Sequence, residues 1–353
     1  MKRSFFMHIS ISILSLALIV ALTSCIHLES IKPVTSQPDT TSQDTSSKQN
    51  ETTIPSESSQ TAVSQDESSA AEQSVESSEE PTPQLKTYDL NGFRITGFEP
   101  SQVSALVSTL KGIIDSAGVN VGFYYEELDT GYSIAYNKDK KFCSGSVIKA
   151  PYAMHLIAVG ADLDEKLTLM SYQKMDGSGN LKNNAAGSSY TVEKLIEYAI
   201  IDSDNTAYRM LYDNYGFDYF NMYAYEFGIE TGCSSTEYLG YLGFLSAYES
   251  GILFKDIYNK SKTNQSAARL LGYLSNTKYH YLLEAGVTNH TVAHKYGYMT
   301  GAYKVLHDVG IVLDSKPYII SIMTDFNPSG GNGRPTLKNI ASAVNNFHDN
   351  FGN

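Results

Sequence analysis

The composition of the chain changes near residue 88, and this change decides which part of it can fold. Between Ile26 and Thr87 more than a third of the residues are Ser or Thr, with scattered Gln, Glu, Asp and Pro and no apolar periodicity. Such a stretch cannot bury enough apolar surface to form a core, so we expect a disordered tether over residues 26–87. The folded domain is expected from Tyr88 to Asn353, a length sufficient for a substantial core.

The first 25 residues have the pattern of an export signal. Lys2 and Arg3 precede a mostly apolar run from Phe5 to Leu22. The run ends in Leu22-Thr23-Ser24-Cys25, which resembles the lipobox of bacterial lipoproteins. That resemblance implies lipidation of Cys25 and an extracytoplasmic domain anchored to the cell membrane. An uncleaved transmembrane helix is the alternative, because the run is about long enough to span a bilayer.

Apolar spacing predicts strands near both ends of the domain and helices between and around them. The early strands 119–128 and 132–136 flank Asp129-Thr130-Gly131, which is a hairpin signal. Two early strands, a helical middle and three late strands imply an α/β sandwich whose sheet joins both chain ends. The expected helices cover 101–117, a stretch from about 144 to 157, a region after Thr191, 245–258 and 335–348, and the expected late strands cover 292–298, 303–313 and 317–324.

Ser146 and Lys149 form a Ser-x-x-Lys motif. In a helix that begins near Ser144, positions i and i+3 share a face, so the lysine amine would lie beside the serine hydroxyl. A serine hydroxyl needs a neighbouring base to act as a nucleophile. A lysine can be that base only if burial or nearby positive charge lowers its pKa. Taken alone, the motif is common by chance.

Two further polar motifs follow along the chain. Ser203-Asp204-Asn205 offers a hydroxyl for proton relay and an amide for holding a substrate, although this pattern by itself is typical of a helix cap. Lys295-Tyr296-Gly297 lies on an expected strand, where a lysine can face either a cleft or solvent. A backbone N–H just beyond the glycine can bind an oxyanion.

In this order, Ser-x-x-Lys, Ser-Asp-Asn and Lys-x-Gly resemble the motifs of class A β-lactamases and penicillin-binding proteins. The resemblance covers nearly all of residues 88–353, including Asp176-Gly177-Ser178-Gly179 and His307-Asp308-Val309-Gly310-Ile311. It implies a β-lactamase-like α/β sandwich, in which both chain ends form an antiparallel sheet beside a helical subdomain. It also implies acyl transfer through a serine.

The resemblance assigns catalytic roles to three side chains. Ser146 attacks the carbonyl of a β-lactam or a D-Ala-D-Ala-like amide, Lys149 acts as a base, and Ser203 passes a proton to the leaving nitrogen. The backbone N–H groups of Ser146 and Tyr298 form the oxyanion hole. These roles carry over because each residue matches a position of the family's motifs.

The resemblance also assigns substrate-binding residues, and one of them departs from the pattern. Asn205 holds the substrate side chain, while Lys295 attracts the substrate carboxylate and helps to keep Lys149 neutral. The family usually has Thr or Ser between Lys295 and Gly297, and here the residue is Tyr296. Its hydroxyl is carried farther from the backbone, so we expect a cost in substrate affinity.

The deacylation base is the second departure. Class A enzymes carry Glu-x-x-Leu-Asn on a loop between the second and third motifs, where the glutamate activates water. The segment from Thr236 to Gly243 contains Glu237, but the leucine has the wrong spacing and no asparagine completes the pattern. Glu237 is a candidate deacylation base, and a surface or capping glutamate is the alternative. Without a base, an acyl-enzyme would persist, as it does in a penicillin-binding protein.

Composition and spacing exclude several partners. The net charge is −12 and there is no basic patch, so we expect no nucleic acid. Only His290 and His294 have the spacing of helical metal ligands, and their stretch is expected to be loop and strand with no third ligand, so we predict no metal and no cofactor.

Cys143 and Cys233 could pair only if they lie close together, which the sequence does not show. We expect a monomer.

Three functions are compatible with these motifs. The first is a lipid-anchored serine hydrolase of the class A β-lactamase type. The second is a cell-wall D,D-peptidase or esterase of the penicillin-binding type. The third is a domain that binds wall peptides without turnover, although such a binder has no need for a nucleophile and its base. The expected partners are thus a β-lactam or a wall peptide, and the membrane through Cys25.

Overall fold

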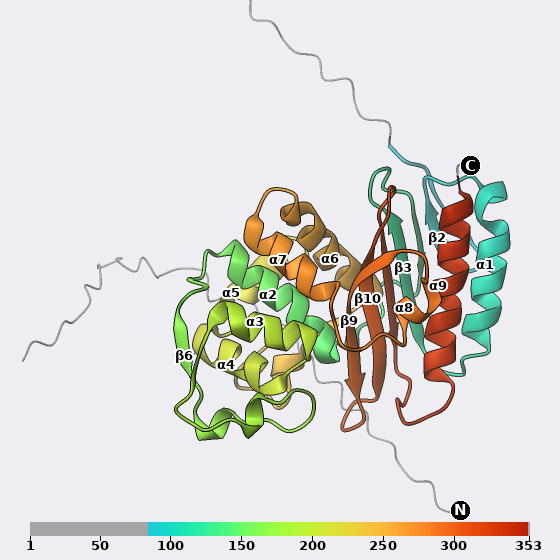
Figure 1. Cartoon of the computed structure of the whole chain (residues 1–353). Coiled ribbons are helices and arrows are strands. Elements are labelled where there is room, and N and C mark those ends of the chain that lie inside the picture. Colours follow the sequence, from blue (N-terminus) through green and yellow to red (C-terminus); the bar gives the residue numbers. More distant parts are fainter. Residues whose placement is uncertain (1–83, 352–353) are drawn as a thin grey trace, which may run out of the picture. The chain divides into compact units, whose positions relative to one another are not determined.

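A seven-stranded sheet organises the residues described by the computed structural model, which are 84–351 (Figure 1). The predicted signal peptide, Cys25 and nearly all of the predicted tether lie outside these residues. The strand order is β1-β2-β4-β3-β11-β10-β9, and every neighbouring pair is antiparallel. The early strands join the late ones where β3 pairs with β11, so both ends of the domain build one sheet, as expected. The strands are β1 (Thr87–Leu90), β2 (Phe93–Thr96), β3 (Val121–Glu127), β4 (Ser133–Tyr136), β9 (Thr291–Met299), β10 (Val305–Leu313) and β11 (Tyr318–Thr324).

The predicted hairpin is confirmed, and a second hairpin precedes it. Strands β3 and β4 pair with Glu126 opposite Ser133. Strands β1 and β2 were not predicted, yet they extend the sheet beyond β4 and pair with Leu90 opposite Phe93. Their two-residue turn is Asn91-Gly92, and both residues have positive φ angles of 51° and 84°. Asn-Gly is the sequence favoured in such turns, because it tolerates this backbone conformation.

Two helices cover one face of the sheet (Figure 1). Helix α1 (Pro100–Asp115) begins with a proline, and the Gln102 side chain caps it by accepting from the Glu99 amide at 2.7 Å. Helix α9 (Gly333–Asn350) closes the described chain beside α1. Both confirm predicted helices. The apolar sides of these helices and of the strands beneath them form one buried cluster, which includes Val103, Leu110, Phe123, Ile320, Leu337 and Val344.

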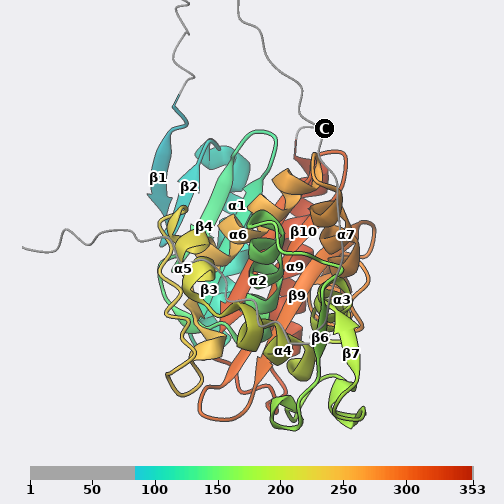
Figure 2. The same cartoon turned by 90° about the vertical axis from the view of Figure 1, so that its left-hand side faces the viewer.

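The helical part lies over the other face of the sheet (Figure 2). Helix α6 (Ala247–Ser261) packs directly on β3, β10 and β11, and helix α2 (Lys149–Ala158) is surrounded by other helices. Every side chain of α2 from Lys149 to Ile157 is buried, so α2 is the core of this layer. The remaining helices are α3 (Val192–Ile201), α4 (Asn205–Tyr215), α5 (Asp218–Tyr225), α7 (Gln265–Leu274) and the short α8 (Leu283–Gly286).

Short elements connect these layers. Two-stranded pairs join β5 (Phe142–Cys143) to β8 (Phe244–Leu245) and β6 (Lys166–Thr168) to β7 (Ser189–Thr191). A 3₁₀ turn, η1 (Gly145–Ile148), leads directly into α2. The remaining 3₁₀ turns are η2 (Ser171–Gln173), η3 (Leu181–Asn183) and η4 (Gly240–Leu242). None of the helices within residues 84–351 combines the length and apolar character needed to cross a membrane.

Candidate functional site

Ser146 lies in the turn η1, where the helical layer meets the edge of the sheet. The predicted helix starts later than expected, since α2 begins only at Lys149, but residues three apart also share a side of a 3₁₀ turn. The turn presses against β9: a Cβ atom on Gly145 would lie 3.6 Å from the Tyr298 nitrogen, and one on Gly297 would lie 2.9 Å from the Ser144 oxygen. The absence of a side chain at Gly297 therefore lets η1 lie close against β9, next to Tyr298, while the Ser146 side chain stays partly exposed.

Lys149 is the first residue of α2, and its amine is buried. The Lys149 Nζ donates to the main-chain oxygen of Ser203 and to the Asn205 Oδ1, both at 2.7 Å, and it lies 3.5 Å from the Ser203 Oγ. Burial lowers the pKa of Lys149 to about 7, although nearby Asp204 acts in the opposite direction. The amine can therefore be neutral near physiological pH.

The segment from Ser203 to Asn205 joins α3 to α4. Its middle side chain caps α4, and the two outer side chains face the amine of Lys149. Asp204 caps α4 by accepting from the Ala207 amide at 2.9 Å, and it also accepts from the Leu181 amide at 2.8 Å. Ser203 has a positive φ of 52°, a conformation that is uncommon for a residue with a side chain. Because Asp204 makes the cap, the oxygens of Ser203 and Asn205 are left to face Lys149.

Lys295 projects from β9 toward Lys149 and Ser203. Its side chain is fully buried, and its Nζ donates to the Ser203 Oγ at 3.0 Å and to the Tyr296 oxygen at 3.2 Å. Burial and the neighbouring amine of Lys149 hold the pKa of Lys295 well below its ordinary value. The structure thus brings Lys149, Ser203, Asn205 and Lys295 into one hydrogen-bonded cluster, although these residues are far apart in sequence.

Tyr296 and Tyr298 differ in their surroundings. The Tyr296 ring is buried beside Tyr279, with ring centres 4.3 Å apart, and the Lys295 Nζ lies 4.2 Å from the centre of the Tyr296 ring. The Tyr296 hydroxyl lies 3.5 Å from the Ser178 Oγ. Burial raises the pKa of Tyr296, while hydrogen bonds from Ser178 and Ser203 oppose that shift. The Tyr296 hydroxyl therefore reaches back toward the cluster, whereas the Tyr298 side chain is exposed.

Ser178 was not predicted as a site residue. Its loop is fastened to the cluster, because the Ser178 oxygen accepts from the Asn205 amide at 3.1 Å and the Asp176 oxygen accepts from the Asn205 Nδ2 at 2.9 Å. The available signal was a polar residue between Gly177 and Gly179. A serine between two glycines does not by itself indicate a function, and only the positions of Asn205 and Tyr296 in the folded chain suggest one.

Glu237 lies in the loop before η4, and its side chain is exposed. Its main chain is held by Ser234 and Gly240. Within residues 84–351, no hydrogen bond or ion pair connects its carboxylate with Ser146, Lys149 or Ser203. A role for Glu237 as a deacylation base remains a prediction from the sequence.

Within residues 84–351, two groups of side chains could hold a metal ion, and Cys143 and Cys233 are not joined. His280, Glu284 and His294 place one ligand atom each within 4.8 Å of the others, as do His290, Asp314 and Asp349. The prediction of no metal assumed that no third ligand lies near His290 or His294, and that assumption is wrong. Cys143 and Cys233 are buried free thiols.

Comparison with known proteins adds to this geometry. The model of the β-lactamase enzyme family matches residues 105–348, which is more than half of the chain. The chain belongs to this family. Among curated proteins, none matches the chain.

Solved structures share the fold of this family member at low sequence identity. PBP-A is 24% identical, with a TM-score of 0.62 over 69% of this chain and 97% of the other. A mutant of PBP-A, solved as an acyl-enzyme complex with penicillin G, is 23% identical, with a TM-score of 0.63 over 70% and 97% of the two chains. A β-lactamase from Sphaerobacter thermophilus is 22% identical, with a TM-score of 0.58 over 70% and 97%. The predicted β-lactamase-like α/β sandwich is therefore confirmed.

The pKa of Lys149 gives a pH-dependent prediction. If the neutral Lys149 amine is the base, acylation of Ser146 by a β-lactam requires loss of a proton from that amine. The rate constant of acylation should therefore rise with pH through about 7 and level off above it. Stopped-flow measurement with a fluorescent penicillin between pH 5.5 and 9 checks this, within a range chosen around that pKa. Lys149→Ala should lose acylation while far-UV circular dichroism stays native, and unchanged labelling would remove Lys149 from the mechanism.

Proposed function

We propose that this protein is a lipid-anchored extracytoplasmic serine hydrolase that is acylated at Ser146 by β-lactams or related amides. The observation that carries the proposal is the buried cluster of Lys149, Ser203, Asn205 and Lys295, which begins three residues after Ser146. Within residues 84–351 no hydrogen bond joins the Ser146 hydroxyl to this cluster, so its approach to Lys149 is part of the proposal. A purely structural cluster of this kind is costly, because two amines lose their hydration with no carboxylate hydrogen-bonded to either of them within the described residues.

The hydrogen bonds of Lys149 fit a proton acceptor. A neutral amine has two N–H groups and one lone pair. The two bonds at 2.7 Å, to the Ser203 oxygen and the Asn205 Oδ1, use both N–H groups. The third contact of the Lys149 Nζ, to the Ser203 Oγ, is longer at 3.5 Å. In the proposed mechanism the lone pair on this remaining side of the amine takes the hydroxyl proton of Ser146 as the Ser146 Oγ attacks the substrate carbonyl.

Ser203 is placed to return that proton to the leaving group. Its hydroxyl accepts from the Lys295 Nζ at 3.0 Å and lies 3.5 Å from the Lys149 Nζ. When the C–N bond of the amide breaks, the Ser203 hydroxyl donates its proton to the leaving nitrogen and is reprotonated by Lys149. The product is an ester between Ser146 and the acyl group.

Backbone donors stabilise the charge that develops on the carbonyl oxygen. In the proposed mechanism these are the N–H groups of Ser146 and Tyr298, and the close contact between η1 and β9 supports this assignment. Because main-chain groups do this work, the exposed Tyr298 side chain does not hinder it.

A carboxylate on the substrate suits Lys295. In the free site, burial and Lys149 both disfavour the charged form of Lys295. A bound carboxylate would supply the missing negative charge, so binding would favour protonation of Lys295. The Tyr296 hydroxyl and the Ser178 hydroxyl, 3.5 Å apart, add donors on the same side.

Deacylation is expected to be slow, which favours the penicillin-binding type as the second candidate function. The observation behind it is the exposed side chain of Glu237, the one glutamate that the sequence offered as the deacylation base. PBP-A, which has the same fold, forms an acyl-enzyme complex with penicillin G in one of its mutants. We therefore expect an ester on Ser146 that outlives its formation by a wide margin.

Membrane anchoring rests on the sequence alone. The basic start, the apolar run and Cys25 at its end support a lipoprotein signal. The Ser- and Thr-rich residues that follow support a flexible connection between the anchor and the enzyme domain.

Labelling with a fluorescent penicillin tests the proposed reaction. The full-length chain should gain the mass of one penicillin, and the adduct should map to the peptide that contains Ser146. Ser146→Ala should form no adduct. Ser144→Ala is the matched control, because the buried Ser144 hydroxyl makes no hydrogen bond within the described part of the chain and has no role in the proposed chemistry.

The time course of the adduct separates the competing functions. A long-lived adduct is the expected result, and rapid loss with release of product would instead indicate an efficient β-lactamase. No adduct at all, together with equal binding of wall peptides by the parent and Ser146→Ala, would contradict the proposal and favour a binding domain. If Glu237 activates water, Glu237→Gln must slow the decay of the adduct, and an unchanged decay removes Glu237 from the mechanism.

Cys25→Ser tests the anchor separately. Cells that produce the parent protein should hold it in the membrane fraction, with an intact mass that includes acyl chains. The Cys25→Ser variant should lack that added mass, because lipidation needs the cysteine thiol. Equal masses of the two proteins, apart from the substituted atom, would contradict lipidation.

A further inference from the structure

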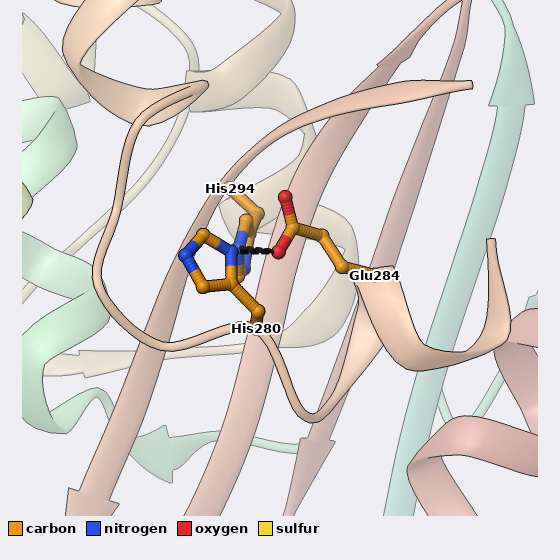
Figure 3. A group of neighbouring side chains, drawn as sticks. All are labelled: His280, Glu284 and His294. Atoms are coloured by element: carbon orange, nitrogen blue, oxygen red, sulfur yellow. Dashed lines mark hydrogen bonds and ion pairs between the residues drawn. The ribbon is translucent and has the colours of Figure 1, made fainter. Parts of the chain in front are cut away.

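Two histidines and a glutamate converge at the edge of the sheet, outside the catalytic cluster. His294 projects from β9, the outermost strand; Glu284 comes from the short helix α8, and His280 precedes that helix (Figure 3). One ligand atom of each lies within 4.8 Å of the other two. The His280 Nδ1 is hydrogen-bonded to the Glu284 Oε2. The same Glu284 oxygen thus faces a nitrogen of both imidazole rings.

The ring of His294 is fixed by a buried carboxylate. Its Nδ1 lies 2.8 and 3.0 Å from the two carboxylate oxygens of Asp308, which is itself fully buried on β10. An N–H at Nδ1 that donates to Asp308 leaves the lone pair at Nε2. That nitrogen lies 3.8 Å from the Glu284 Oε2. Metal-binding histidines commonly have such a carboxylate behind them, because it sets the orientation and raises the basicity of the ring.

Asp308 also positions the helix that carries Glu284. Its Oδ2 accepts from the Leu283 amide at 3.1 Å, at the first residue of α8. A single buried carboxylate therefore holds both the ring of His294 and the segment of Glu284. In this structure the Thr277 Oγ1 lies 3.0 Å from the His294 Nε2, so the Thr277 side chain must turn about its Cα–Cβ bond before this nitrogen can bind an ion.

His280, the most exposed member of the three-residue group, can change its position. The His280 side chain is 59% exposed, so its ring can shift without disturbing the core. Bonds of about 2.0–2.1 Å to a tetrahedral ion place neighbouring ligand atoms about 3.3 Å apart. The separation of 3.8 Å between His294 and Glu284 is near that value, and an outward movement of His280 completes the arrangement.

We propose that His280, Glu284 and His294 form a binding site for Zn²⁺ or a similar first-row divalent ion. Two imidazoles and one carboxylate are the ligand types that these ions prefer, and the exposure of His280 leaves a coordination position for water. The two positive charges of the ion balance the carboxylates of Glu284 and Asp308. The ion fastens the residues around α8 to β9, the strand that also carries Lys295.

The other histidine group provides a matched control. His290 lies just before β9 and is partly buried, with its Nε2 2.8 Å from the Asp349 Oδ1. It resembles His294 in its ion pairing, but its ring does not contact His280 or Glu284. Loss of His290 should therefore leave the proposed site intact.

Metal titration of the full-length chain, prepared without a histidine tag, tests this site. After treatment with a chelator, Zn²⁺ is titrated against a chromophoric chelator, and Co²⁺ is added separately to record its visible spectrum. We expect one tight equivalent and a higher melting temperature with Zn²⁺. His280→Asn and Glu284→Gln should each weaken binding at least about tenfold, and Asp308→Asn about 10–100-fold. His290→Asn should retain the affinity of the parent.

Each alternative outcome contradicts the proposal. No Zn²⁺ bound by the parent would mean that the group is an ion-paired cluster only. Equal affinity in the parent, His280→Asn and Glu284→Gln would place the ion elsewhere, as would its loss in His290→Asn. Melting curves without metal show whether each variant is folded. Because the readout is metal affinity, a failure of the proposed hydrolase leaves this test unaffected.

Discussion

Two lysines buried around one serine hydroxyl are the constraint on which this site depends. Lys149 and Lys295 both contact Ser203, and neither amine is hydrogen-bonded to a carboxylate within residues 84–351. Lowering the pKa of Lys149 from 10.5 to about 7 corresponds to about 5 kcal/mol at 1.36 kcal/mol per pKa unit. That is a large share of the 5–15 kcal/mol that typically stabilises a folded domain. Such a cost is typical of functional sites, and it supports the proposed role of the two buried amines.

The fold provides this environment by joining segments that are distant in sequence. The turn η1 and helix α2 supply Ser146 and Lys149, the α3–α4 connection supplies Ser203 and Asn205, and β9 supplies Lys295. Close contact of Gly145 and Gly297 sets η1 against β9. The cap made by Asp204 fixes the α3–α4 connection. Burial of α2 from Lys149 to Ile157 then keeps water from Lys149, which is the cause of its lowered pKa.

Local sequence patterns predicted many of the helices and strands. They did not identify residues whose partners come from distant parts of the chain. Apolar patterns located α1 and α9, which each bury one face, and β3, β4 and the late strands, whose apolar runs are mostly buried on both faces. Strands β1 and β2 were missed although Asn91-Gly92 marks their turn and apolar residues alternate in both, since each strand has only four residues. The three motifs identified the cluster only through a family resemblance. Ser178 and the group around His294 could not be found, because their partners come from other elements and only the folded chain shows which atoms meet.

The central claim is that Lys149 is an uncharged amine near neutral pH. A direct measurement is the titration of its amine by NMR in protein labelled with ¹⁵N-lysine, with the signal assigned by its loss in Lys149→Ala. The account predicts a pKa of about 7 for this amine, far below that of the exposed lysines. A pKa near the ordinary value of 10.5 would contradict it, because Lys149 would then be charged and could not accept the proton of Ser146.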